Sequence, residues 1–244
     1  MNDQVPYRND HYTLPQLIED SKILIEELRK HSPEELSQLM QISHDIATMN
    51  YERYIRWNTP FTPQNASQAL FTFKGQAYQG LKADDFSQED ITFAQDHLRI
   101  LSGLYGLLRP LDLIMPYRLE MGTKLINPRG KDLYEFWNDK ITKALNEALS
   151  SHNQRLVVNL ASNEYYKAIK SGQLKADIVT PIFREQKGDQ YKTIAVYAKM
   201  ARGMMTRYII QNRIDNPQDI KGFDWKGYVF TPSMSTENEW VFVR

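Results

Sequence analysis

Two basic residues near the start of a predicted helix could bind an anion. Lys199 and Arg202 fall in the segment 199–213, which the sequence predicts to be helical, and their spacing of three places them on one helical face with Thr206. Cations in the first turn of a helix oppose the helix dipole, so they cost stability unless an anion or carboxylate offsets them. We therefore expect these residues to bind phosphate. The alternative is a salt bridge to an Asp or Glu elsewhere, and Arg207 is expected at the surface.

A glycine-containing stretch at 97–112 predicts a second place for phosphate. It reads HLRILSGLYGLLRPLD, in which an apolar helix meets two glycines three residues apart, Gly103 and Gly106. A helix, tight turn and second helix would expose backbone N–H groups that can hold one phosphate. The pattern resembles the helix-hairpin-helix element of DNA-binding proteins. The alternative is a plain helix C-cap at Gly103, and Pro110 limits any second helix.

The next segment, 116–131, concentrates polar and basic residues. Arg118 can bind a phosphate with two parallel hydrogen bonds, and Lys124, Arg129 and Lys131 can add point charges. Tyr117 could stack on a base or pack in the core. The alternative for Arg118 is an internal ion pair with Glu120.

Polar residues also follow a predicted buried strand at 156–160, which is where sites collect in open α/β sheets. Ser162 is expected first of all to cap the next helix. The alternative to simple DNA binding is an enzyme that acts on a nucleobase or nucleoside. In such an enzyme a carboxylate would act as base or stabilise a cationic sugar. Lys199 would be the nucleophile if burial lowered its pKa. The candidate catalytic residues are Asp112, Glu120, Asn159, Ser162, Glu164 and Lys199.

Metal and nucleotide chemistry find little support in the sequence. The five histidines are scattered, no H-x-x-x-H pair is present, and there is no cysteine, so we expect no metal site and no cofactor. The G-x-x-x-x-G-K-[ST] loop, the Rossmann fingerprint and the G-x-S-x-G elbow are all absent.

These residues need elements to position them, and the first third predicts helices. A capping box at Thr13 and Gln16 starts one, Ser32-Pro33 with Glu35 starts a second that reaches Met49, and Thr62-Pro63 starts a third that ends near Lys74. Ser87 caps a fourth helix, and Asp132 caps one that runs through Ala148.

The second half adds strands. The apolar run 156–160 suits a strand covered on both faces, a short helix follows from Ser162 to about Gly172, and the strands 178–183 and 191–198 flank hairpin residues at 187–189. Closing strands are predicted at 228–230 and 240–243. Helices and strands mix without βαβ alternation, so the predicted fold class is α+β, a mixed sheet with surrounding helices and an embedded helix-hairpin-helix, in a single domain of residues 1–244.

Charge distribution and hydropathy indicate which partners and which cellular location the protein can have. The 244 residues have zero net charge, but residues 1–98 hold 8 Lys and Arg against 15 Asp and Glu, and residues 99–244 hold 22 against 15. This asymmetry suggests an anionic partner for the basic part, unless the two parts neutralise each other. No apolar run reaches about 18 residues, and MNDQVPYRND is no secretory signal, so we expect no membrane span and a cytoplasmic protein.

Several long motifs in order resemble the YaaA family of peroxide-stress proteins over nearly the whole chain. They are FKGQAYQGL at 73–81, LSGLYGLLRPLD at 101–112, PYRLEMG at 116–122, GKDLYEFW at 130–137, NLASNEYYK at 159–167 and AKMARG at 198–203. The resemblance implies a bacterial cytoplasmic protein that protects against hydrogen peroxide and is linked to lower intracellular free iron. It also implies a mixed α/β fold and a basic cleft that binds double-stranded or branched DNA.

Carried onto this sequence, the family's hairpin falls on Gly103, Leu104, Tyr105 and Gly106. The basic residues expected to contact DNA are Arg109, Arg118, Lys124, Lys167, Lys199 and Arg202. A small nucleotide-like molecule is the alternative ligand. Direct iron binding is the weakest of the hypotheses, because the histidines are scattered and there is no cysteine.

Two departures from the family stand out. Relatives begin with a strand and a loop reading roughly I-S-P-A-K-T-L-D, whereas this chain opens with MNDQVPYRND, so we expect the family's N-terminal strand and its lysine to be missing. Met200 stands where relatives often carry another lysine. With one charge fewer, the slope of the logarithm of DNA affinity against the logarithm of salt concentration would be shallower by at most about one unit.

Overall fold

The computed structural model describes residue 1 and residues 11–244, so the expected loss of the N-terminal strand lies outside the described residues. The chain folds as two compact units, each assembled from separate stretches of sequence. Unit 1 comprises 1–73, 98–147 and 162–174, and unit 2 comprises 74–97, 148–161 and 175–244. The prediction of a single domain stays a prediction.

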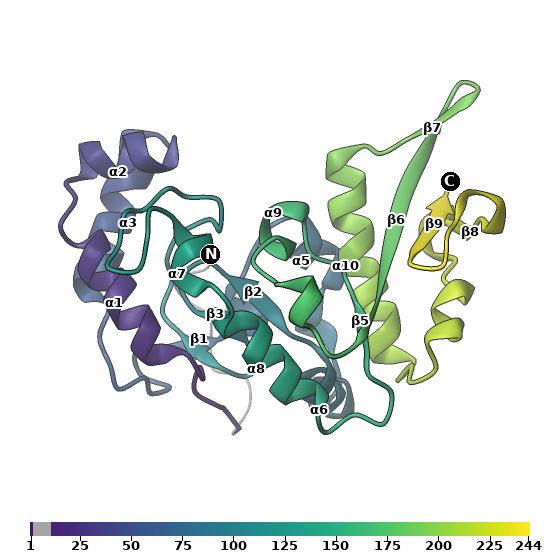
Figure 1. The fold of residues 1–244 in the computed structure, drawn as a ribbon, viewed down its shortest axis with the longest axis horizontal. Helices are drawn as coiled ribbons and strands as arrows, with labels where there is room; N and C mark the ends of the chain where they lie inside the picture. The colour runs from purple at the N-terminus through teal and green to yellow at the C-terminus, as the bar shows by residue number, and fades with distance from the viewer. Residues whose placement is uncertain (2–10) are drawn as a thin grey trace. The chain divides into compact units, whose positions relative to one another are not determined.

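Three helices open unit 1: α1 (Ile18–Leu28), α2 (Pro33–Met40) and α3 (His44–Arg56), seen in Figure 1. The capping box predicted for α2 is confirmed, because Ser32 and Glu35 each accept the other's backbone N–H. The predicted continuation to Met49 is wrong. Gln41 adopts a left-handed conformation (φ 53°) that ends α2, and Ser43 caps a new helix.

Short strands replace two predicted helix starts in unit 1. Thr13 does not cap α1; its backbone N–H bonds to the carbonyl of Leu111, and the residue forms a bridge with Asp112. Thr62-Pro63 starts no long helix, since β1 (Ser67–Gln68) and α4 (Ala69–Thr72) occupy that stretch. β1 pairs with β4 (Leu113–Ile114), and β2 (Ile100–Ser102) pairs with β3 (Gly106–Leu108), both antiparallel.

The remaining helices of unit 1 follow from residue 132 onward. Asp132 caps α7 (Leu133–Trp137) as predicted, but Asn138 (φ 44°) ends it, and α8 (Lys140–Leu149) begins separately. α9 (Asn163–Tyr166) is a single turn, followed by the 3₁₀ helix η2 (Ser171–Gln173). Trp137 is fully buried, and its indole Nε1 donates to the carbonyl of Gly103 (3.0 Å).

Unit 2 is built on a five-stranded mixed sheet. The strands are β5 (Leu156–Val158), β6 (Asp177–Lys187), β7 (Gln190–Lys192), β8 (Val229–Phe230) and β9 (Glu239–Val243). The order is β5-β6-β9-β8, with β7 paired to β6; β5–β6 and β6–β9 are parallel, and the other pairs are antiparallel. The sheet confirms the α+β class. Residues 156–158 form the predicted strand, and β5 pairs in parallel with β6. The expected cover on both faces is not found, because β5 lies at the sheet's edge with half-buried side chains.

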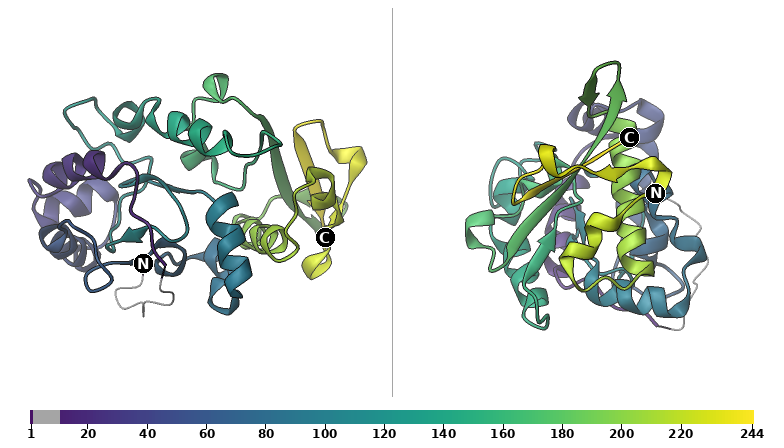
Figure 2. Two further views of the ribbon diagram at one scale, coloured as in Figure 1. Left: turned by 90° about the horizontal axis from the view of Figure 1, so that it is seen from below. Right: turned by 90° about the vertical axis from the view of Figure 1, so that its right-hand side faces the viewer.

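The helices of unit 2 pack on one another, and α10 (Ala195–Gln211) packs against this sheet (Figure 2). The others are α5 (Gln76–Leu81) and α6 (Gln88–His97), with 3₁₀ turns η1 (Ala83–Asp85), η3 (Pro217–Gly222), η4 (Trp225–Gly227) and η5 (Pro232–Met234). Ser87 caps α6 as predicted, exchanging hydrogen bonds with Asp90. Ala195–Ala198, predicted as strand, form the start of α10.

Two glycines bring α10 and α5 into close contact. A Cβ at Gly203 would lie 1.7 Å from the carbonyl oxygen of Ala77, and one at Gly80 would lie 2.1 Å from that of Met200. Only residues without a side chain permit this approach. It holds α10, with the predicted Lys199–Arg202 pair, against the segment that follows Lys74.

Candidate functional site

The predicted helix-hairpin-helix at 97–112 is not confirmed. α6 ends at His97, and the chain then makes the β-hairpin β2–β3, whose three-residue loop closes at Gly106 in a left-handed conformation (φ +69°). This is a standard hairpin geometry, with glycine at the left-handed position. A continuous apolar run fits a strand as well as a helix, which is why its pattern did not discriminate.

The four hairpin residues 103–106 are all buried. Leu104 and Tyr105 have no exposed surface; the Tyr105 N–H donates to Ser102 Oγ (2.8 Å), and its hydroxyl accepts from Trp57 Nε1 (2.9 Å). Burial raises the pKa of the Tyr105 hydroxyl. This placement gives the hairpin a role in the core of unit 1 and does not support a direct contact with DNA.

Asp112 and Arg109 form an ion pair in which the carboxylate is buried and the guanidinium is partly exposed. The Asp112 carboxylate is 1 % exposed and accepts from Arg109 N (2.7 Å), Arg109 Nη2 (2.9 Å) and Thr13 Oγ1 (2.6 Å). Arg109 also donates to the carbonyl of Leu14 (2.9 Å). These contacts tie the chain near residue 13 to β4, so the predicted catalytic Asp112 and the predicted DNA contact Arg109 stabilise one another.

An extended segment of unit 1 alternates between buried and exposed residues. Tyr117, Leu119 and Met121 are buried, whereas Arg118, Glu120 and Lys124 point to solvent. Tyr117 is therefore a core residue; its hydroxyl hydrogen-bonds Ser102 Oγ (2.5 Å). The ion-pair alternative for Arg118 is confirmed, at 2.6 Å from Arg118 Nη2 to Glu120 Oε1.

Glu164 joins this segment to α9. Its carboxylate accepts from the Gly122 N–H (2.8 Å), and its backbone carbonyl accepts from the Tyr134 hydroxyl (3.0 Å). Lys167, one turn later and exposed, lies over the Tyr134 ring at 4.7 Å from its centroid. We call Arg118, Lys124 and Lys167 the unit 1 basic patch. Burial, with the charges of Glu164 and Glu120, raises the pKa of Tyr165.

Asn159 and Ser162 fall in different units. Asn159 is buried; its amide donates to Thr180 Oγ1 (3.3 Å) and its carbonyl oxygen accepts from the Ala161 N–H (3.2 Å). Ser162 occupies the N-cap position of α9 as predicted, although its hydroxyl makes no capping hydrogen bond. Of the six candidate catalytic residues, Asp112, Glu120, Asn159 and Glu164 thus bond within their own unit.

Lys199 and Arg202 lie one turn apart on α10. Arg202 is partly buried, and the loss of water around its guanidinium lowers its pKa. Across residues 1 and 11–244, neither side chain has a carboxylate or other hydrogen-bond acceptor within reach. The salt-bridge alternative is thus not realised in that range. A partly buried arginine without a counter-charge is a costly arrangement, and an anionic ligand would offset its cost.

Two further predictions on α10 need correction. The Thr206 hydroxyl donates to the Arg202 carbonyl (2.9 Å) and is not free for an anion. Arg207 is no plain surface residue: its guanidinium bonds the carbonyl of Lys82 (2.6 Å), pairs with Asp85 and lies over the Phe86 ring.

Lys74 is a further basic residue of unit 2 that was not predicted from the sequence as a DNA contact. This residue is exposed just ahead of α5, the helix that contacts α10, and it has no ion pair in the described ranges. The signal was the motif FKGQAYQGL, whose Gly80 lies at the helix contact. We call Lys74, Lys199 and Arg202 the unit 2 basic patch.

No group of three or more His, Cys, Asp or Glu is placed to hold a metal ion in residues 1 and 11–244. No helix in the same ranges is both long enough and apolar enough to span a membrane.

Comparison with known protein families gives a match over most of the chain. The family model described as peroxide stress protein YaaA matches residues 1–234, which is nearly the whole chain.

Proposed function

The chain belongs to the YaaA family of peroxide stress proteins, and from this premise we propose that it acts in peroxide stress by binding DNA through its two basic patches. The observation that carries the proposal is Arg202, a partly buried guanidinium with no anionic partner in residues 1 and 11–244. Phosphate is an anion that a guanidinium binds with two parallel hydrogen bonds. Lys199 and Lys74 add charge in the same unit.

The proposed ligand is double-stranded or branched DNA, bound without preference for sequence. The patches consist of Lys and Arg, which contact phosphates, and phosphates carry no base information. The unit 1 basic patch would supply further contacts, chiefly from Lys124 and Lys167, because Arg118 is already paired with Glu120. We expect the affinity to fall steeply with salt as counterions are released.

The decisive test is a titration of duplex DNA at several salt concentrations. The variant Lys199→Ala/Arg202→Ala should bind at least about 30-fold more weakly at low salt, because two charged hydrogen bonds are lost. Its log–log salt slope should be shallower by about 1.8, the value for two phosphates. Fluorescence anisotropy with labelled duplex measures both.

A matched control removes the same charge elsewhere. Lys143→Ala/Arg56→Ala also deletes two cations, but each of these pairs with a carboxylate four residues earlier, Asp139 and Glu52. The control should bind nearly as the parent does. An equal loss in both variants, or no binding by the parent at low salt, would refute the proposal. If the protein binds a nucleoside phosphate instead of DNA, and this binding requires Arg202, the unit 2 basic patch is a site for a small anion.

The proposal extends to the cell. It includes the link between this family and lower intracellular free iron, so the chain should restore peroxide survival and a low free-iron level to cells lacking their own family member. Lys199→Ala/Arg202→Ala should restore neither, whereas the Lys143→Ala/Arg56→Ala control should restore both. Survival counts and free-iron measurements decide the matter. If a variant that no longer binds DNA fully restores peroxide survival, the role in peroxide stress does not depend on DNA binding.

A further inference from the structure

Methionine supplies all the sulfur of these 244 residues, which hold nine methionines and no cysteine. In a member of a peroxide-stress family, the sulfur chemistry open to peroxide is therefore the oxidation of methionine to methionine sulfoxide. The methionines differ in accessibility. Met121 and Met205 have no exposed surface, Met49 keeps 41 % of its surface exposed, and Met40 is half-buried.

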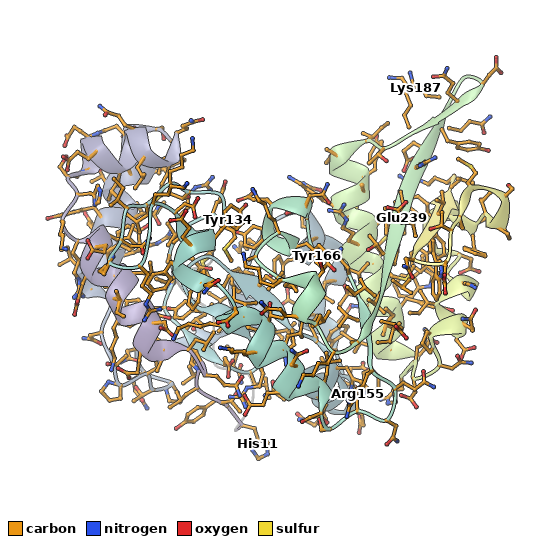
Figure 3. All side chains as sticks on the ribbon, viewed as in Figure 1. His11, Tyr134, Arg155, Tyr166, Lys187 and Glu239 are labelled. Carbon is orange, nitrogen blue, oxygen red and sulfur yellow. The ribbon has the colours of Figure 1, made fainter. Side chains whose placement is uncertain are left out.

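Met40 is the last residue of α2. Gln41 ends the helix in a left-handed conformation, and the Ser37 hydroxyl donates to the carbonyl of Ile42 (2.6 Å), which fixes the turn that follows. α2 and α3 pack on each other at the margin of unit 1, where their outer side chains face solvent (Figure 3). Part of the Met40 surface is therefore open to a small oxidant such as peroxide.

The hydroxyl of Tyr54, a fully buried residue of α3, lies within reach of two acceptors. They are the backbone carbonyl of Arg118 and the sulfur of Met40, which is 3.9 Å from the hydroxyl oxygen. A hydroxyl has one proton and a thioether is a weak acceptor, so the proton goes to the Arg118 carbonyl. Burial raises the pKa of Tyr54, which keeps the hydroxyl protonated. This hydrogen bond ties the segment 117–121 to α3.

We propose that Met40 is a site of oxidation by peroxide, and that its sulfoxide takes the Tyr54 hydrogen bond away from the Arg118 carbonyl. The sulfur attacks one oxygen of hydrogen peroxide, the O–O bond breaks, an S–O bond forms, and the other oxygen leaves with both hydrogens as water. Sulfur loses two electrons and peroxide gains them, so no further reactant is needed. An oxygen on the Tyr54 side of the sulfur would shorten the 3.9 Å gap to the range of an O–H···O hydrogen bond.

The consequence falls on the segment 117–121. Without the Tyr54 proton the Arg118 carbonyl loses a donor, and the segment is held to α3 less firmly. The side chain of Arg118 belongs to the unit 1 basic patch, so peroxide would act on a surface that carries this patch. The change is reversible, because methionine sulfoxide reductases restore the thioether. The modification needs only peroxide and is independent of the DNA binding proposed above.

Graded treatment with hydrogen peroxide, followed by peptide mass spectrometry, tests the modification. Met40 should convert to the sulfoxide about tenfold faster than the buried Met121 and Met205, and at a rate close to that of the exposed Met49. A methionine sulfoxide reductase should convert it back. A Met40 that oxidises no faster than Met121 and Met205 would overturn the proposal.

Hydrogen–deuterium exchange of the segment 117–121 tests the consequence. In the oxidised parent its amides should exchange about tenfold faster than in the untreated protein, because one hydrogen bond is lost. Met40→Leu conserves volume and cannot be oxidised, so peroxide should leave its exchange unchanged. Met49→Leu is the matched control and should respond to peroxide as the parent does.

Tyr54→Phe keeps the ring and removes the hydroxyl. This variant should exchange at the faster rate before any treatment, and oxidation of Met40 should add nothing. Equal melting temperatures of Met40→Leu, Met49→Leu and the parent will confirm that these two variants fold. If peroxide speeds exchange in Met40→Leu as much as in the parent, or leaves exchange unchanged in a parent whose Met40 is converted, the proposal is overturned and the proposed function stands.

Discussion

Gly203→Ala should lower the free energy of unfolding by about 3 kcal/mol. The added Cβ would lie 1.7 Å from the carbonyl oxygen of Ala77 and 2.8 Å from the backbone nitrogen of Leu81, so α10 would have to move away from α5. Overpacking of this kind costs about 1–3 kcal/mol, and more when the obstacle is backbone. It outweighs the gain of about 1 kcal/mol that alanine brings to a helix interior. Urea unfolding followed by circular dichroism measures the difference.

Gly172→Ala is the matched control for this prediction. Gly172 lies in a short 3₁₀ helix with no atom within 4 Å of an added Cβ, and its φ is not positive. Its stability should change by less than about 0.5 kcal/mol. Similar stabilities for Gly203→Ala and Gly172→Ala would mean that α10 and α5 are not in close contact. Because the unit 2 basic patch lies on these segments, Gly203→Ala should also weaken DNA binding.

Asp112→Ala should destabilise the protein by about 3–5 kcal/mol. The substitution removes a buried carboxylate that accepts hydrogen bonds from Arg109 and Thr13, and it leaves the Arg109 guanidinium without its counter-charge. The loss combines the broken ion pair with the Arg109 backbone N–H and the Thr13 hydroxyl, which are left without their acceptor. Unfolding in urea, together with resistance to a protease, provides the measurement.

The same variant separates a structural from a catalytic role for Asp112. A catalytic carboxylate could be removed with little loss of stability, so an Asp112→Ala protein that is as stable as the parent would contradict the structural role. Glu52→Ala removes an exposed carboxylate that also pairs with an arginine of its own element, Arg56, and should change stability by less than about 1 kcal/mol. The contrast shows that burial, not charge alone, sets the cost.

Helix and hairpin starts were predictable where the decisive contacts are local. The capping box of Ser32 and Glu35, the caps at Ser87 and Asp132, and the turn at Gly188-Asp189 each depend on residues at most four positions apart. Their lengths were less predictable. Gln41 and Asn138 end helices in conformations with positive φ that side chains rarely adopt, and the apolar pattern continues across both.

The sequence by itself determined the family, the α+β class and the pair Lys199–Arg202, because long motifs, local caps and helical spacing are properties of neighbouring residues. Only the tertiary structure decided which charges are free. Arg109 pairs with Asp112, Arg118 with Glu120 and Arg207 with Asp85. Arg202 pairs with no carboxylate in residues 1 and 11–244. The tertiary structure also shows that residues 100–108 form a β-hairpin. Ion pairing and burial depend on residues brought together by folding, and sequence spacing does not report them.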